Sequence, residues 1–168
     1  MGSIREVEYQ RRRLAAAFAR AQALTGNQAL EELQADYARH LCVLVSGFIE
    51  RSIAEIILAY AQGRAPAPLR SFLENSLKRL TNVDKDRLLN VVGSLDAGWR
   101  TELENYVVDE RQAAINSIVG LRNDIAHGGG GSISLVQVER YWVVVQEVID
   151  RVETLILPAA PAARHRRR

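Results

Sequence analysis

Hydrophobic residues recur along most of this chain at intervals of three and four positions, which is the period of an α-helix with one buried face. Residues 4–24 contain no Gly or Pro and are rich in Arg, Ala, Glu and Gln, so they favour a helix that ends at Thr25 and Gly26. A second helix is predicted from Asn27, a good N-cap residue, to Gln62. Together the two helices would form a helical hairpin.

The second predicted helix is the best candidate for the centre of the core. It is interrupted only by Gly47, and Gly63 and Pro66 follow its end. Its apolar residues cover most of its circumference, which is typical of a helix buried on several sides. They are Leu41, Leu44, Val45, Phe48, Ile49, Ile53, Ile56 and Ile57.

Two shorter amphipathic helices are predicted at residues 67–81 and 84–97. Their apolar residues are Leu69, Phe72, Leu73, Leu77 and Leu80 in the first and Leu88, Leu89, Val92 and Leu95 in the second. A further helix is predicted to begin at the T-E-L-E sequence of residues 101–104, which matches a capping box. It would run to residue 127, where the four glycines of residues 128–131 stop it.

The last predicted helix opens at Ser134, because S-L-V-Q at residues 134–137 matches a second capping box. Its apolar stripe has coiled-coil-like spacing and consists of Val138, Trp142, Val145, Ile149, Val152 and Ile156. No segment of useful length alternates as a strand does, so the predicted fold class is all-α, an antiparallel helical bundle. We expect one helical domain over residues 1–157 and a disordered basic tail over residues 158–168.

The charge distribution argues against a protein that coats nucleic acid nonspecifically. The formal net charge is +2, and four arginines lie among the last five residues, so the rest of the chain is not basic. The single cysteine, Cys42, lies in an apolar run and is interpreted as a small buried hydrophobic residue. No secretory signal, bilayer-spanning stretch or lipidation motif is present, so we expect a cytoplasmic protein without membrane contact.

Polar residues at the end of the helix before the glycines are the strongest candidates for chemistry. At about 100° per residue, Asn123 and His127 lie roughly 40° apart and face away from the apolar stripe of that helix, while Arg122 lies on its flank. A structural histidine is the usual alternative, but a polar pair facing outward at a helix end fits it poorly. An Arg-Asn pair with a His five positions after the Arg is expected by chance only about 0.015 times in such a chain.

The segment L-R-N-D-I-A-H-G at residues 121–128 resembles the Arg-x4-6-His signature of the HEPN superfamily, and is most similar to its bacterial RNase-like branches. The resemblance covers the bundle loosely, and only the short motif is specific. It implies that Arg122 and His127 are the catalytic pair of a ribonuclease, with Asn123 as a supporting polar residue. It further implies a toxin–antitoxin or phage-defence role, with structured RNA such as tRNA as substrate and a cognate antitoxin as a partner.

The implied reaction is RNA cleavage without a metal or other cofactor. RNA carries its own nucleophile, the 2′-OH, so forming a 2′,3′-cyclic phosphate needs only proton transfer and stabilisation of charge on the phosphorane. A histidine can move the protons and a guanidinium can hold phosphate oxygens. One His and one Arg facing outward make half of such a site, so we expect a homodimer in which Arg122 and His127 of both subunits meet.

Glu50 is a candidate for orienting Arg122 or His127. It shares a face with Ser46 on the central helix, and a solvated face or a structural ion pair is the favoured alternative. Asp36 and His40 also share a face, but no further ligands accompany them, so no metal site is expected.

Two other interpretations of the chain stay open. It could be a noncatalytic HEPN-like module that binds RNA or a protein partner, or a helical structural subunit in which the motif is accidental. Trp99, Tyr106, Tyr141 and Trp142 could stack on RNA bases, although helical spacing favours core positions for them.

Overall fold

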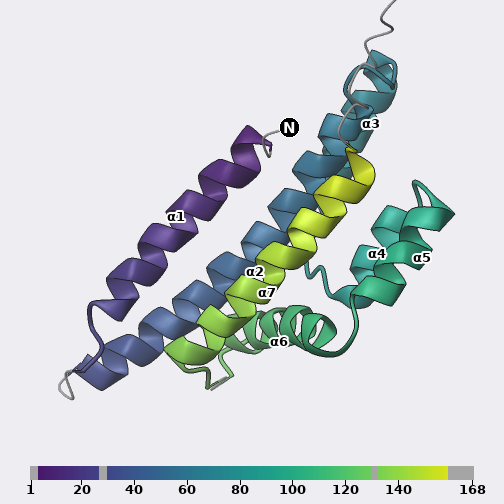
Figure 1. Cartoon of the computed structure of the whole chain (residues 1–168). Coiled ribbons are helices and arrows are strands. Elements are labelled where there is room, and N and C mark those ends of the chain that lie inside the picture. Colours follow the sequence, from purple (N-terminus) through teal and green to yellow (C-terminus); the bar gives the residue numbers. More distant parts are fainter. Residues whose placement is uncertain (1–3, 27–29, 130–131, 159–168) are drawn as a thin grey trace, which may run out of the picture.

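The computed structural model describes residues 4–26, 30–129 and 132–158, and within them the chain forms seven α-helices and no strand. The helices are α1 (Arg5–Gln22), α2 (Glu31–Ala61), α3 (Ala67–Leu77), α4 (Lys85–Gly93), α5 (Ala97–Tyr106), α6 (Asp109–Ala126) and α7 (Leu135–Ile156) (Figure 1). The predicted all-α helical bundle is confirmed.

The long helix α2 is the central element, in contact with α1, α3, α6 and α7. In Figure 1, α1 lies along one side of α2 and runs opposite to it, α7 lies along α2 in the same direction, and α6 crosses near their lower ends. This arrangement follows from the apolar residues of α2, which are buried around most of the helix.

An aromatic cluster joins three of these helices. The ring of Trp142 on α7 stacks on Phe18 of α1 at 6.0 Å and meets Phe48 of α2 edge-on at 4.9 Å. The edge-on packing of Trp99 against Tyr60 at 5.2 Å links α5 to α2 in the same way. Both tryptophans are therefore packing residues.

The start of α7 agrees with the sequence prediction. The hydroxyl of Ser134 accepts a hydrogen bond from the backbone N–H of Gln137 at 3.2 Å, as the capping box requires. The whole predicted apolar stripe of this helix is buried against the rest of the bundle. None of the described helices is long and apolar enough to cross a membrane.

The predicted continuous helix over residues 101–127 is wrong. The carboxylate of Asp96 accepts a hydrogen bond from the backbone N–H of Trp99 at 2.9 Å, so α5 begins before Thr101. The chain then turns at the fully buried Val107, and α6 begins anew at Asp109, whose φ is +47°. The Asp96 cap accounts for the earlier start of α5, and the break at Val107 makes α6 alone the helix that carries the motif.

Other boundaries differ in detail. α3 and α4 end at Leu77 and Gly93, before the predicted ends, and α3 buries none of its residues; Leu69 and Phe72 stay exposed. α2 begins at Glu31, whereas Asn27, the predicted N-cap, lies outside the described residues, as do Gly130, Gly131 and the predicted tail from residue 159.

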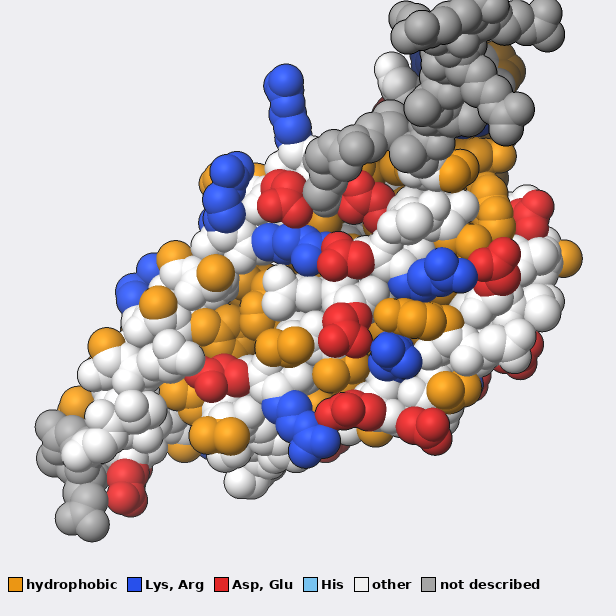
Figure 2. All heavy atoms as spheres, in the orientation of Figure 1, with side chains coloured by type: hydrophobic (Ala, Val, Ile, Leu, Met, Phe, Trp, Pro, Cys, Tyr) orange, Lys and Arg blue, Asp and Glu red, His pale blue; other side chains and the backbone are white. Residues whose placement is uncertain are grey.

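Charged side chains of both signs are interspersed on the face shown in Figure 2, with apolar side chains between them. Some of the arginines are paired with carboxylates of neighbouring helices, as in Arg11 with Asp150 and Arg151 with Glu102. Most of the described arginines form no ion pair, so an unpaired guanidinium indicates an anion site only where neighbouring groups also position it.

Candidate functional site

The helix that carries the motif is held firmly against the core. α6 buries Ala114, Ile115, Ile118 and Val119 and packs on α2 and α7. At the crossing with α2, the thiol of Cys42 donates to the backbone carbonyl of Ile118 at 3.6 Å. Burial raises the pKa of the Cys42 thiol to about 11, so it remains a neutral packing group, as its sequence context predicted.

Two of the four glycines shape the end of α6. The N–H of Gly128 donates to the carbonyl of Ile125 at 3.2 Å, and the N–H of Gly129 donates to the carbonyl of Asp124 at 2.8 Å, which is the Schellman pattern. Gly128 has a φ of +74°, and a Cβ on Gly129 would lie 2.9 Å from the Asp124 oxygen. Glycine is therefore strongly favoured at both positions, where the helix ends directly after His127.

His127 occupies the C-cap position of α6 and is exposed to solvent. Its backbone N–H donates to the carbonyl of Asn123 at 3.0 Å, which continues the helical hydrogen bonds. Within the described part of the chain its imidazole makes no hydrogen bond or ion pair. Both ring nitrogens are therefore accessible to a ligand or to another subunit.

Arg122 is partly buried and oriented by two neutral side chains. Its Nη1 donates to Oδ1 of Asn82 at 3.2 Å and to Oδ1 of Asn123 at 3.1 Å. No carboxylate of the described residues pairs with it, unlike Arg11 and Arg151. The guanidinium is thus positioned without being neutralised, and its remaining N–H groups can bind an anion.

Asn82 connects Glu50 to Arg122. It lies in the segment between α3 and α4 with a φ of +53°, and its backbone N–H donates to Oε1 of Glu50 at 2.7 Å. Glu50 therefore contacts Arg122 only through Asn82. The favoured alternative for Ser46 and Glu50, a solvated face or a structural ion pair, does not describe them. Ser46 is buried, and Glu50 is partly buried and forms no ion pair with the described residues.

Sequence reasoning did not identify Asn82 as a site residue. The available signal was an asparagine in a short connection between two helices, because Asn tolerates positive φ better than other residues with a side chain. That signal indicates a turn, but it does not say which side chain the amide will meet.

Comparison with protein families matches residues 8–157 to the model described as RiboL-PSP-HEPN. The chain belongs to the RiboL-PSP-HEPN family. This confirms the HEPN resemblance. Because HEPN domains are typically ribonucleolytic, membership suggests a ribonuclease. Neither the search of curated proteins nor the search of solved structures found a match.

The two motif residues of this RiboL-PSP-HEPN chain do not form a closed pair within one subunit. Arg122 and His127 are five positions apart on one helix, which separates their directions by roughly 140°. Arg122 turns toward Asn82, whereas His127 lies at the exposed helix end. Asp124 is exposed and forms no ion pair with the described residues, as expected for a solvated side chain.

The remaining candidates from the sequence lie elsewhere in this RiboL-PSP-HEPN fold. Asp36 and His40 are exposed on α2, and Asp36 forms an ion pair with Arg39. The described residues contain no group of three or more His, Cys, Asp or Glu side chains placed to hold a metal ion. Glu50 lines a groove of about 540 Å³ that is formed by α2, α3 and the segment after α3, and that carries charges of both signs.

Proposed function

We propose that this chain is a metal-independent RNA endonuclease of the HEPN type, with Arg122 and His127 as its catalytic residues. One observation carries the proposal: the guanidinium of Arg122 is held by the amide oxygens of Asn82 and Asn123, and no described carboxylate neutralises it. A positioned but unpaired guanidinium suits a ligand with negative oxygens, such as a phosphodiester. Family membership supports a ribonuclease rather than another phosphate-binding protein.

The reaction requires no group beyond RNA and these side chains. The 2′-OH of a nucleotide attacks the adjacent phosphorus, its proton passes to one imidazole, and the bond from phosphorus to the 5′-oxygen breaks as a second imidazole donates a proton to that oxygen. The products are a 2′,3′-cyclic phosphate and a 5′-OH end. Arg122 binds the phosphate oxygens on which negative charge builds up, and His127 transfers the protons.

The need for two imidazoles leads to a homodimer. A single subunit offers one motif histidine, and its imidazole faces solvent at the end of α6. Two exposed valines lie in the N-terminal half of α7, Val136 at 75% and Val143 at 56% exposure, on the same face because they are seven residues apart. We propose that this face of α7, on which the exposed Arg140 lies between the two valines, is in the dimer interface and brings the two His127 side chains together.

The biological role follows from the resemblance. We propose that the enzyme acts as a toxin of a toxin–antitoxin pair or in phage defence, on structured RNA such as tRNA, and that an antitoxin protein restrains it. Expression in bacterial cells should then arrest growth. The His127→Ala variant, produced at the same level, should leave growth unaffected.

The decisive experiment is RNA cleavage in the presence of EDTA. The wild-type protein should cleave RNA to 2′,3′-cyclic phosphate ends and leave a substrate with 2′-deoxy sugars intact. Arg122→Ala and His127→Ala should each abolish cleavage while the protein stays folded and dimeric. Arg87→Ala, which removes an exposed arginine of α4, is the matched control and should remain active. RNA binding without cleavage by the wild type would instead identify a noncatalytic binding module.

A further inference from the structure

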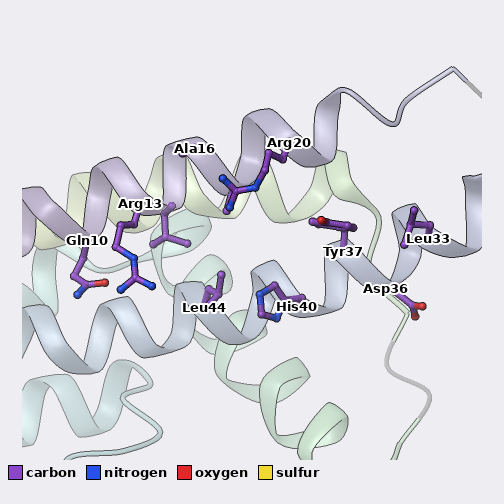
Figure 3. A pocket seen from close by; sticks show the side chains of 11 residues that line it. Gln10, Arg13, Ala16, Arg20, Leu33, Asp36, Tyr37, His40 and Leu44 are labelled. Carbon is purple, nitrogen blue, oxygen red and sulfur yellow. The ribbon is translucent and has the colours of Figure 1, made fainter.

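A second region of the molecule has the features of an anion-binding groove. It lies between α1 and α2, has a volume of about 710 Å³, and is lined by neither Arg122 nor His127 (Figure 3). Two of its lining residues on α1, Ala16 and Ala17, have small side chains that fill little of the space between the two helices. Its volume is in the range of pockets that hold small ligands.

Three basic side chains line this groove. Arg13 and Arg20 reach into it from α1, and His40 stands on α2 across from Arg20 (Figure 3). Neither arginine forms an ion pair within the described residues; Arg13 only packs over the ring of Tyr9, at 5.7 Å. The one acidic lining residue, Asp36, is already paired with Arg39. The groove therefore carries uncompensated positive charge.

The spacing of the two arginines favours a strand over a single phosphate. They are seven residues apart, which is roughly 10 Å along the helix, and their guanidinium groups enter the groove at separate places in Figure 3. Tyr37, Leu33 and Leu44 add a ring and an apolar surface beside them. Guanidinium groups with a neighbouring aromatic ring are the combination that binds single-stranded nucleic acid, the guanidinium on phosphate and the ring on a base.

The groove is separate from the motif. His40 faces α1, whereas Cys42, two residues later and thus about 200° around the helix, faces the carbonyl of Ile118 on α6. The groove and the motif helix consequently lie on opposite sides of α2 (Figure 1). A ligand in the groove does not occupy the site of Arg122.

We propose that the groove between α1 and α2 binds a single-stranded segment of RNA, with Arg13 and Arg20 on two of its phosphates and a base against Tyr37. The inference rests on the proposed function in so far as RNA is the substrate. It adds a contact remote from the motif, which would hold a flanking strand of the RNA while cleavage takes place at Arg122 and His127.

Binding is measured on the His127→Ala protein, so that the RNA is not cleaved, by fluorescence anisotropy with a labelled 12-nucleotide single strand. Replacing Arg13 and Arg20 by Ala should weaken binding about tenfold or more, and should reduce the slope of log K against log salt by about 1.4, since two phosphate contacts are lost. Tyr37→Leu should weaken binding about fivefold or more. Circular dichroism and melting temperature establish that each variant is folded.

The matched control replaces Arg5 and Arg12 by Ala. Both residues are exposed on α1 and lie outside the groove. Their replacement removes two positive charges, as the groove variant does. If this control weakens binding as much as the groove variant, the effect is bulk charge and the inference is overturned. Displacement of the labelled RNA by AMP would also overturn the inference, because it would identify the groove as a pocket for a free nucleotide. If the groove variant binds and cleaves RNA as well as its parent protein does, the RNA-binding role of the groove is refuted and the nuclease proposal stands. If binding depends on the groove residues but the wild-type protein cleaves no RNA, the nuclease proposal is refuted and the binding role of the groove stands.

Discussion

The guanidinium of Arg122 and the side-chain amide of Asn82 lie within hydrogen-bond distance, 3.2 Å from Nη1 to Oδ1, although 40 positions separate the two residues in the sequence. Asn82 is in turn held through its backbone N–H by Glu50 on α2. Three segments of the chain therefore fix the orientation of one arginine. The relationship makes the turn between α3 and α4 part of the proposed catalytic site.

Asn82→Gly should lower RNA cleavage about tenfold without changing thermal stability. Glycine accepts the φ of +53° and keeps the N–H that Glu50 binds, so only the oxygen that orients Arg122 is lost. Asn82→Ala should show the same loss of cleavage and, in addition, a free energy of unfolding lower by about 1 kcal/mol from strain at positive φ. Cleavage rates and denaturant unfolding measure both. Full activity of the glycine variant would mean that Asn82 does not position Arg122.

Mixing subunits tests whether the site is shared. If both subunits supply His127, only dimers of two wild-type chains are active. After equal amounts of wild type and His127→Ala have exchanged subunits, activity per wild-type chain should fall to about half, since random pairing leaves half of the wild-type chains with a wild-type partner. In the control, the wild type exchanges subunits with a wild-type protein that carries a bulky tag, and the activity per chain should not change. Activity per wild-type chain that stays constant would show that each subunit cleaves independently.

The exposed valines of α7 should be required for the dimer. Val136→Asp combined with Val143→Asp places two charges on the proposed interface, so the protein should become monomeric and lose at least tenfold in cleavage while its helical content is retained. Light scattering and circular dichroism are the measurements. The control is Leu69→Asp on α3, an exposed apolar residue remote from α7 in sequence. A dimer that survives the double substitution places the interface elsewhere.

The glycine after His127 should matter for both stability and cleavage. Gly128→Ala forces an alanine to a φ of +74°, which should lower the free energy of unfolding by about 1 kcal/mol and reduce cleavage by displacing His127. Gly120→Ala lies in the middle of the same helix with nothing within 4 Å of an added Cβ, and should instead stabilise the protein by about 0.5–1 kcal/mol. Chemical unfolding of the pair distinguishes the two roles. Equal effects would refute the proposed helix termination.

The buried thiol predicts a pH dependence. Because burial raises the pKa of Cys42 to about 11, the folded protein keeps this proton at pH values where the unfolded chain releases it. The associated stability is fully present below the pKa of an unfolded thiol, and falls by up to about 2–3 kcal/mol as pH rises toward 11. Unfolding in urea with a reductant, from pH 7 to 10.5, should show this decline. In the Cys42→Ala variant the free energy of unfolding should fall less steeply with pH. The same fall in both proteins would contradict the prediction.

The helices themselves could be predicted because their signals are local. Composition without Gly or Pro indicated α1, and apolar residues at helical spacing indicated α2 and α7. Ser134 marked the start of α7, since its partner, Gln137, is three residues away. The exposed position of His127 also followed from periodicity within one helix. The capping box at Thr101 was misleading, because the helix that contains Thr101 is capped at Asp96 and ends at Tyr106.

By itself, then, the sequence determined the fold class, the central helix and the short motif, because each depends on neighbours within a few turns of helix. Only the tertiary structure decided that Arg122 meets Asn82, that Glu50 acts on it through a backbone N–H, and that Arg13 and Arg20 share a groove with His40. These contacts join residues that are far apart in the chain. They depend on the angle at which α6 crosses α2 and on the distance between α1 and α2. Both are set by the packing of whole helices, which the local sequence pattern does not encode.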